Sequence, residues 1–217
     1  MHQRFCRALQ EDGMKLYPSI SKSTGQAFRE FDAYVFDKVD GSNLRFEWSR
    51  KRGWYKYGTR SRLFDHTDEV FGEAIQTFNA QLADPIAAVA KKKGWDNCVA
   101  FAEFWGNQSF AGEHFAGDPK ILTLFDVAAY KVGILDPRDY LDLFGDLQIA
   151  KLLGKYKWTR GFVEQVRLNQ IPGVTFEGVV GKMMDGKRLI MAKAKTQQWL
   201  DKVKERYGVN ADAILNS

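Results

Sequence analysis

"FDKVDGSNLRFEW" occupies residues 36–48 and joins two segments in which apolar and polar side chains alternate. Such alternation is typical of β-strands, so we expect strands over residues 33–38 and 43–48. Asp40 and Gly41 favour a turn, and the two strands are expected to pair as a β-hairpin. Lys38 stands beside this turn among apolar and aromatic neighbours, where a lysine is unusual. Its position is the first sign of a functional site.

The rest of the chain is predicted to mix strands and helices. Strands are expected over residues 54–59, 98–104 and 121–130, and helices over 68–93, with a break at Asp84-Pro85, and over 137–144. Residues 174–195 alternate as two strands around Asp185-Gly186, which is a strong hairpin signal. Residues 196–207 have an amphipathic helical pattern that Gly208 ends. Together these patterns predict an α+β fold.

The length and composition are those of one globular domain. The 217 residues are 45% apolar and include 16 phenylalanines, enough for a sizeable core. We therefore expect a single domain over residues 1–217. Only nine residues follow Gly208, so no OB-fold or other second domain is expected after it.

The sequence also indicates a cellular compartment. It has no apolar run of about 18 residues, so no membrane segment is expected. The start of the chain, "MHQRFCRALQEDG", lacks the apolar region of a signal peptide. Cys6 and Cys98 are far apart and lack metal-site spacing, as is usual in a reducing cytoplasm. We expect a cytoplasmic protein, in a bacterial or a virus-infected host cell.

Positive charge is concentrated in two segments. The net charge is +5, but residues 151–217 hold 13 basic and 6 acidic residues, a balance of +7. Residues 38–62 hold 8 basic against 2 acidic residues. If the two segments converge they form a surface that attracts phosphates. If they do not, they are two solvated faces, and charge alone leaves both readings open.

Several common sites are absent from the sequence. It has no phosphate-binding G-x-x-x-x-G-K-[ST], no G-x-G-x-x-G and no H-E-x-x-H. The three histidines, His2, His66 and His114, are dispersed, which disfavours a histidine metal site or a hydrolase triad. We expect them to be surface residues or to be hydrogen-bonded within the core.

Lysines, carboxylates and one aromatic residue remain as candidates. They are Lys38, Glu103, Phe125, Glu177, Lys193 and Lys195. Each has an ordinary structural explanation when taken alone: a solvated lysine pair, a core phenylalanine, a glutamate paired with an arginine. Lys193 and Lys195 are two residues apart in a predicted strand, so both side chains are expected on one face. The order of the six along the chain is more informative than any one of them.

That order resembles the covalent nucleotidyltransferases, the superfamily of ATP-dependent DNA and RNA ligases and mRNA capping enzymes. Lys38-Val39-Asp40-Gly41 matches the lysine motif, Arg60 in "YGTRSR" the arginine motif, Glu103 in "FAEFWG" the glutamate motif, Phe125 in "LFDV" the aromatic motif, Glu177 in "EGVV" the fourth motif, and Lys193 and Lys195 in "MAKAK" the last. Arg60 is preferred to Arg62. The resemblance covers about residues 15–195 and implies an ATP-grasp-like nucleotidyltransferase (adenylation) domain, with antiparallel sheets flanked by helices.

Within the superfamily the chain most resembles the RNA ligase 2 group. Asn43, two residues after the motif glycine, is typical of that group, as is the lead-in "KLYPSI" that begins at Lys15. Asp37 departs from it, because the group usually has glutamate before the lysine. Asp40 is more typical of DNA ligases, so a minimal DNA ligase stays open as an alternative.

The resemblance also implies a role for each residue. Lys38 is the nucleophile that takes AMP from ATP, and Lys193 and Lys195 neutralise phosphate charge. Glu103 binds the ribose hydroxyls, Phe125 stacks on adenine, Asn43 and Arg60 orient phosphates, and Glu177 helps to hold Mg²⁺ or Mn²⁺. Asp126 is expected to have a supporting role.

The expected partner is nucleic acid with 5′-phosphate and 3′-hydroxyl ends, with RNA favoured and DNA as the alternative. Because no clamping domain is expected, a partner protein for nick repair is a further expectation. Two other readings are a capping guanylyltransferase, which depends on an OB domain, and a non-catalytic protein that binds nucleic-acid ends. A protein that only binds nucleic-acid ends does not need a lysine nucleophile, two glutamates and a lysine pair together, which argues against the last reading.

Overall fold

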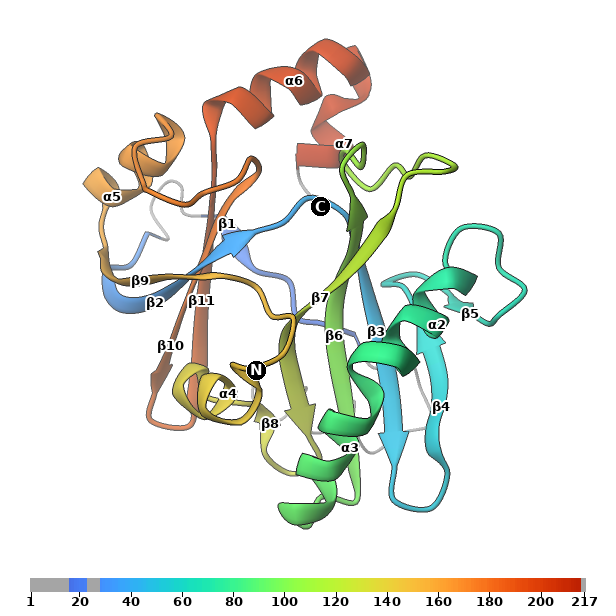
Figure 1. The fold of residues 1–217 in the computed structure, drawn as a ribbon. Helices are drawn as coiled ribbons and strands as arrows, with labels where there is room; N and C mark the ends of the chain where they lie inside the picture. Colours follow the sequence, from blue (N-terminus) through green and yellow to red (C-terminus); the bar gives the residue numbers. More distant parts are fainter. Residues whose placement is uncertain (1–15, 23–27, 216–217) are drawn as a thin grey trace. The chain divides into compact units, whose positions relative to one another are not determined.

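The computed structural model describes residues 16–22 and 28–215 and divides into two compact units (Figure 1). Of the described residues, the first unit comprises 16–18 and 41–149, and the second comprises 19–22, 28–40 and 150–215. Each unit is built on one β-sheet, called sheet B in the first unit and sheet A in the second. The expectation of a single domain over residues 1–217 stays a prediction.

Sheet B is antiparallel, with strand order β5-β4-β3-β6-β7-β8. Its strands are β3 (Ser42–Ser49), β4 (Gly53–Gly58), β5 (Leu63–Phe64), β6 (Asn97–Gly106), β7 (Lys120–Ala129) and β8 (Gly133–Ile134). The helices of this unit are α2 (Gly72–Gln81), α3 (Ala83–Lys92) and α4 (Pro137–Phe144).

Helices α2 and α3 cover one face of sheet B (Figure 1). Alternate residues of β3 point to that face, and the Phe46 ring stacks on Phe78 of α2 with ring centroids 3.9 Å apart. The predicted helical break is present, but it lies at Leu82 rather than at Asp84-Pro85. Pro85 lies in the first turn of α3, where an N–H would have no helical partner, so a proline is tolerated there.

Sheet A has strand order β1-β11-β10-β2-β9. Its strands are β1 (Ser21–Lys22), β2 (Phe31–Lys38), β9 (Leu152–Trp158), β10 (Gly178–Asp185) and β11 (Arg188–Lys195). All pairings are antiparallel except that of β1 with β11. The helices of this unit are α5 (Arg160–Arg167), α6 (Gln197–Tyr207), the 3-10 helix η2 (Gly208–Asn210) and α7 (Ala211–Leu215).

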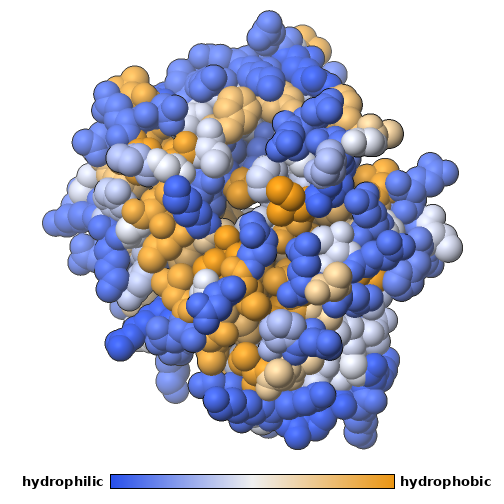
Figure 2. All heavy atoms as spheres, in the orientation of Figure 1, coloured by the Kyte–Doolittle hydropathy of each residue, from blue (hydrophilic) through white to orange (hydrophobic). Residues whose placement is uncertain are grey.

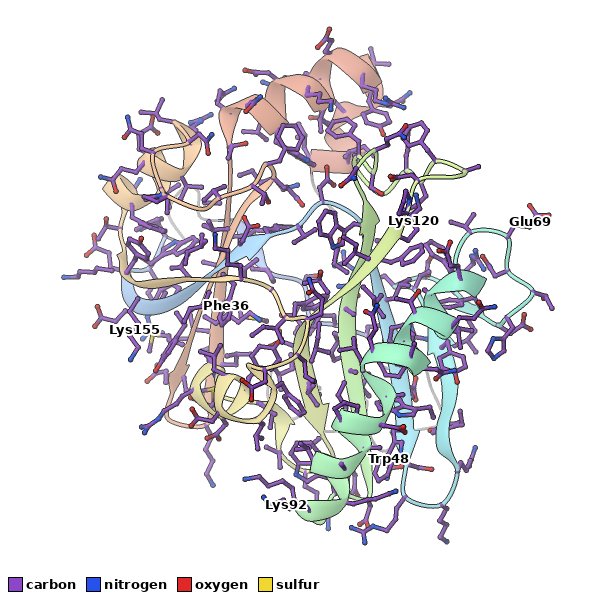
Figure 3. The ribbon with its side chains drawn as sticks, viewed as in Figure 1. Phe36, Trp48, Glu69, Lys92, Lys120 and Lys155 are labelled. Atoms are coloured by element: carbon purple, nitrogen blue, oxygen red, sulfur yellow. The ribbon has the colours of Figure 1, made fainter. Side chains whose placement is uncertain are left out.

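The two faces of sheet A differ in character. On one face, small and aliphatic residues of β2, β10 and β11 pack with Trp158 and with Phe162 and Val166 of α5 in a hydrophobic cluster. Lys38 and Lys195 alternate with members of that cluster along their strands, so they lie on the opposite face. Figure 3 shows Lys155, an exposed residue of the edge strand β9, at the margin of the molecule.

The predicted hairpin of residues 33–38 and 43–48 is wrong. Both segments are strands, β2 and β3, but they belong to different sheets. β2 pairs with β9 and β10, and β3 pairs with β4 and β6, so neither strand has a free edge for the other. The turn at Asp40 and Gly41 is therefore the place where the chain passes from the second unit to the first.

Most other predicted elements are confirmed. These are strands β4, β6 and β7, helix α4, the hairpin of β10 and β11, and helix α6, which ends at Gly208 with φ of 51°. Helix α6 is amphipathic as predicted: Trp199 and Val203 are buried, and its side seen in Figure 2 is mostly hydrophilic. Strand β9 and helix α5 were not predicted. Across the described residues, no helix has both the length and the hydrophobicity to cross a bilayer.

Candidate functional site

In the second unit, Lys38 and Lys195 share one carboxylate. The Lys38 Nζ donates a hydrogen bond to Glu177 Oε2 at 2.7 Å, and the Lys195 Nζ lies 3.2 Å from Glu177 Oε1. The Glu177 side chain is only 4% exposed, and that of Lys195 is 10% exposed. Each oxygen of a buried carboxylate thus faces one ammonium group. We call Lys38, Glu177 and Lys195 the lysine cluster.

Strand register explains how residues so distant in sequence meet. Lys38 ends β2, Lys195 ends β11, and both lie opposite Gly178, the first residue of the intervening strand β10. Glu177 directly precedes this row, so its carboxylate can contact both neighbours. A Cβ on Gly178 would lie 2.0 Å from the Ala194 carbonyl oxygen, so only glycine fits in the middle of the row.

Lys193 lies on the same face of β11 as Lys195, one row further along the sheet. It lies opposite Val180, which in turn lies opposite Phe36 of β2. Its side chain is partly exposed. The predicted placement of Lys193 and Lys195 on one face is therefore present, and Lys195 is the one that pairs with Glu177.

Burial has the largest influence on Lys195 and lowers its pKa from the usual value, because a buried ammonium group loses hydration. Glu177 opposes this and favours the charged form, whereas the Lys38 ammonium again disfavours it. The net pKa is lowered. The Lys195 ammonium group therefore loses its proton more readily than that of a surface lysine.

Asp37 has a structural role. It is 4% exposed and accepts hydrogen bonds from the backbone N (3.0 Å) and the Oγ1 (2.7 Å) of Thr175. Burial raises the pKa of Asp37, and the two Thr175 bonds oppose the rise. Asp37 therefore links β2 to the segment that precedes Glu177.

In the first unit, Asn43, Glu103 and Thr123 form a row across β3, β6 and β7. Asn43 and Glu103 are partly exposed, whereas Thr123 is buried and accepts a hydrogen bond from the Trp105 indole at 2.9 Å. Two of the predicted residues, Asn43 and Glu103, are thus adjacent on one sheet face.

Phe125 occupies a β-bulge of β7. Phe101 lies opposite Asp126 and Ala102 lies opposite Leu124, so Phe125 is the extra residue between them. Its ring is contacted edge-on by Tyr17 at 5.0 Å and lies 6.4 Å from Phe101 in a stacked arrangement. The bulge thus directs an aromatic ring, partly exposed, away from the regular pleat.

Tyr17 is a residue that the sequence prediction did not select, although it lies in the "KLYPSI" stretch. Its hydroxyl donates to the buried Asp126 carboxylate. Burial and the neighbouring Asp126 charge together raise the pKa of Tyr17 well above its usual value. Tyr17 therefore packs edge-on against the Phe125 ring while its hydroxyl is bonded to Asp126. The supporting role expected for Asp126 stays a prediction. Lys15, where the resemblance begins, and Cys6 and His2 lie outside the described residues.

Arg60 is exposed at the tip of a turn after β4. The turn is closed by a 2.8 Å bond from Thr59 N to Arg62 O. The Arg62 guanidinium pairs with Asp68 and lies 5.4 Å from the Phe71 ring centroid. Among the residues that the structure describes, the Arg60 side chain makes no hydrogen bond. Arg60 is thus the arginine that extends from this turn while Arg62 is held.

Arg45, another residue that was not predicted, supports this turn from within. Its guanidinium is 2% exposed, lies 3.4 Å from Glu47 Oε1 and donates to the Thr59 carbonyl oxygen. Gly58 lies opposite Arg45 in the β3–β4 ladder. A Cβ on Gly58 would lie 2.4 Å from Arg45 Nη2, so the glycine makes room for the guanidinium.

The histidine prediction is confirmed for the described residues. His114 lies between two hydroxyls, 2.9 Å from Ser42 Oγ and 3.3 Å from Ser109 Oγ. Burial lowers the pKa of His114. His66 is exposed.

The described carboxylates could give a metal ion only a few protein ligands. Over the described residues, no group of three or more His, Cys, Asp or Glu could hold a metal ion. Mg²⁺ commonly takes one or two carboxylates and completes its octahedron with water and substrate phosphate oxygens. Glu177 is an oxygen donor of this kind, and each of its oxygens is paired with a lysine in this structure.

The fold is similar to that of solved ATP-dependent RNA ligases. An archaeal ATP-dependent RNA ligase (form 1) matches with a TM-score of 0.61 and 17% identity over 93% of this chain and 57% of its own. Naegleria gruberi RNA ligase with PPi matches with a TM-score of 0.57 and 18% identity over 89% of this chain and 65% of its own. A variant of the same Naegleria gruberi ligase with ATP and Mn has a TM-score of 0.58 and 15% identity over 79% of this chain and 51% of its own.

In sequence, no family model and no curated protein matches the chain. The chain spans between 51% and 65% of the chains in these three ligase structures. At 15–18% identity the likeness establishes the fold, and the predicted α+β fold class is confirmed. The fold of this chain is the one that these ATP-dependent RNA ligases contain.

Proposed function

We propose that this chain is an ATP-dependent RNA ligase that joins 5′-phosphate and 3′-hydroxyl ends through a lysyl-AMP intermediate. The observation that carries the proposal is the lysine cluster. A partly buried lysine at the end of a strand is held 2.7 Å from a buried glutamate, and a second lysine is held by that same glutamate. The fold shared with solved RNA ligases supports it.

The first step makes Lys38 the nucleophile. Its amine attacks the α-phosphorus of ATP, a P–N bond forms, the bond from that phosphorus to the bridging oxygen breaks, and pyrophosphate leaves. Only the free amine attacks, and an unperturbed lysine has a pKa of about 10.4. Lys38 lies between Glu177, to which it donates a hydrogen bond, and the Lys195 cation, which is held by the same carboxylate.

Glu177 is the residue that would hold Mg²⁺ or Mn²⁺. A divalent cation held there would supply positive charge to the phosphates, and Glu177 would then be shared between the cation and the lysines. Lys195 and Lys193 add fixed positive charge on the same sheet face, where negative charge grows on the phosphate oxygens during transfer.

The residues of the first unit are assigned to substrate orientation. Glu103 accepts hydrogen bonds from the ribose hydroxyls, and the Phe125 ring stacks on adenine. Asn43 and the exposed Arg60 orient phosphates, for which a guanidinium is suited because its donors form a planar fork. In the second step the 5′-phosphate of a strand takes AMP from Lys38, and in the third the 3′-hydroxyl displaces AMP.

RNA is the proposed substrate, because Asn43 is typical of the RNA ligase 2 group and because the structural neighbours are RNA ligases. A minimal DNA ligase is the second candidate, supported by Asp40 in the lysine motif. We assign the protein to repair of nicks in the cytoplasm, with a separate clamp protein as a partner.

Incubation with ATP labelled at the α-phosphate and Mg²⁺ tests the proposal. We expect an acid-labile AMP on the wild-type chain and none on Lys38→Ala. Failure of the wild type to label would sink the enzyme reading and favour a non-catalytic end-binding protein. Labelling by GTP would instead indicate a capping guanylyltransferase. Sealing of matched RNA, DNA and hybrid nicks then separates the RNA ligase from the DNA ligase.

A further inference from the structure

Trp199 contacts two of the motif residues at once. It lies in the first turn of α6 and is 1% exposed. Its indole Nε1 donates a 2.7 Å hydrogen bond to Asp40 Oδ2. The Lys195 Nζ lies 3.7 Å from the centroid of its ring. No motif of the sequence singled this tryptophan out.

Thr196 fixes where Trp199 stands. Its Oγ1 accepts a 3.1 Å bond from the Trp199 backbone N and so caps α6, and it donates a 2.6 Å bond to the Phe176 carbonyl oxygen. The Thr196 backbone N donates to the Glu177 carbonyl oxygen at 3.0 Å. The start of α6 is therefore tied to the backbone that bears the bridging glutamate.

These contacts form a closed ring of interactions. Lys38 contacts Glu177, Glu177 contacts Lys195, Lys195 lies over Trp199, and Trp199 binds Asp40, which is two residues from Lys38. A tryptophan ring attracts a cation placed over its face more strongly than phenylalanine or tyrosine does. An indole N–H that donates to a carboxylate is a charge-assisted bond, which is stronger than a neutral one.

We propose that Trp199 is a positioning residue for the adenylation step, an inference that rests on the proposed function. Its N–H sets the direction of Asp40, and its ring holds Lys195. Once Lys38 carries AMP it is no longer an ammonium ion, and Glu177 then keeps one lysine partner. The Trp199 ring and Glu177 together keep Lys195 in place through the later transfers.

Two substitutions separate the two contacts. Trp199→Phe removes the N–H and keeps a ring, whereas Trp199→Leu removes both. Trp54→Phe is the matched control, because the Trp54 indole donates a comparable 3.0 Å bond to the Ala83 carbonyl oxygen in the first unit. All three full-length variants are compared with the wild type by circular dichroism and thermal melting, so that unfolding is recognised.

The functional measurement is the single-turnover rate of lysyl-AMP formation over a range of ATP concentrations. For Trp199→Phe we expect the rate at saturating ATP to fall by about tenfold, the effect of losing a charge-assisted hydrogen bond, with little change in the half-saturating ATP concentration. Trp199→Leu should fall further, and Trp54→Phe should stay within about twofold of the wild type. A fall in Trp199→Phe no larger than in Trp54→Phe would overturn the proposal.

An NMR measurement keeps the inference separate from the proposed function. In ¹⁵N-labelled protein, the indole signal assigned by its absence from Trp199→Phe should move when Asp40 is replaced by Ala, while the Trp54 indole signal stays. If the wild type forms no lysyl-AMP, the proposed function fails, but this coupling is still measured. If the wild type forms lysyl-AMP but the Trp199 indole signal does not move in Asp40→Ala, the positioning role fails and the proposed function stands.

Discussion

The lysine cluster of sheet A and the row of Asn43, Glu103 and Thr123 on sheet B are held in different ways. In the lysine cluster, a buried carboxylate is paired with two ammonium groups, so each charge depends on the others. On sheet B, the candidate residues are carried by regular strands, and neutral aromatic residues support Phe125. Substitution in the cluster should therefore change both chemistry and stability, whereas substitution in the row should change mainly binding.

The largest effect is expected at Lys38. Lys38→Arg keeps a cation that can pair with Glu177, but a guanidinium is always protonated and cannot attack phosphorus. We expect at least a 10⁴-fold loss of lysyl-AMP, estimated from the loss of an essential nucleophile, with a melting temperature close to that of the wild type. Labelling with ATP and thermal melting measure the two quantities. Residual labelling of Lys38→Arg would place the nucleophile elsewhere.

Glu177→Gln should separate the two regions in stability. The change leaves two lysines without their carboxylate. Removing one partner of a buried ion pair lowers the free energy of unfolding by about 3–5 kcal/mol. We expect the lower end of this range because Lys38 is partly exposed. Glu103→Gln, on a partly exposed position of sheet B, should cost less than about 1 kcal/mol. Urea unfolding measures both. Equal losses would contradict the difference between the regions.

Tyr17→Phe tests the aromatic support of sheet B. The change leaves the buried Asp126 carboxylate without the Tyr17 hydroxyl, which should cost about 1–3 kcal/mol in unfolding free energy. The pKa of Tyr17 is raised in the folded chain. The stabilisation that the Tyr17 hydroxyl gives the folded state is therefore complete below the unfolded pKa of about 10, and it is lost as the pH rises toward the folded pKa. The difference between Tyr17→Phe and wild type should thus shrink above about pH 10. A constant difference from pH 8 to 11 would argue against this role.

The smallest effect is expected in the pH dependence of Lys195. Its pKa is lowered in the folded chain, so the unfolded chain binds more protons between the folded pKa and the unfolded value of about 10.4. The contribution of Lys195 to the free energy of unfolding therefore rises with pH between these two values, whereas that of Tyr17 falls as the pH rises. Comparing wild type with Lys195→Met at a series of pH values up to 10 measures the slope. Parallel stability curves for the two proteins would show that the burial of Lys195 has no such effect.

The strands and helices were largely predictable because local alternation and turn residues specify them. The strand positions of β4, β6 and β7 and the hairpin of β10 and β11 followed from such patterns. Pairing between distant strands did not, which is why β2 and β3 were assigned to one hairpin although each pairs elsewhere. Helix α5 and strand β9 were missed; much of β9 is exposed, so its pattern is weak.

The candidate site was predicted as a set of residues and not as a set of contacts. Motif order selected Lys38, Glu177 and Lys195, but their shared carboxylate depends on a register between residues 139 positions apart. Tyr17 and Trp199 also act through long-range contacts, whereas Arg45 contacts residues 2 and 14 positions away; no motif marks any of the three. The residue types around Lys38 indicated a functional site, whereas the strand register of sheet A determines which of its side chains contact one another.

The separation of β2 from β3 has a consequence for the order in which the protein is made. Residues 41–149 of the first unit are continuous, so sheet B is complete when its last strand has been synthesised. Sheet A is not continuous in sequence, because β2 pairs with β9 and β10, which are translated more than 100 residues later. During synthesis, Lys38 therefore emerges early and gains its carboxylate late. The lysine cluster therefore forms only after the last strands of sheet A have been synthesised, long after sheet B can fold.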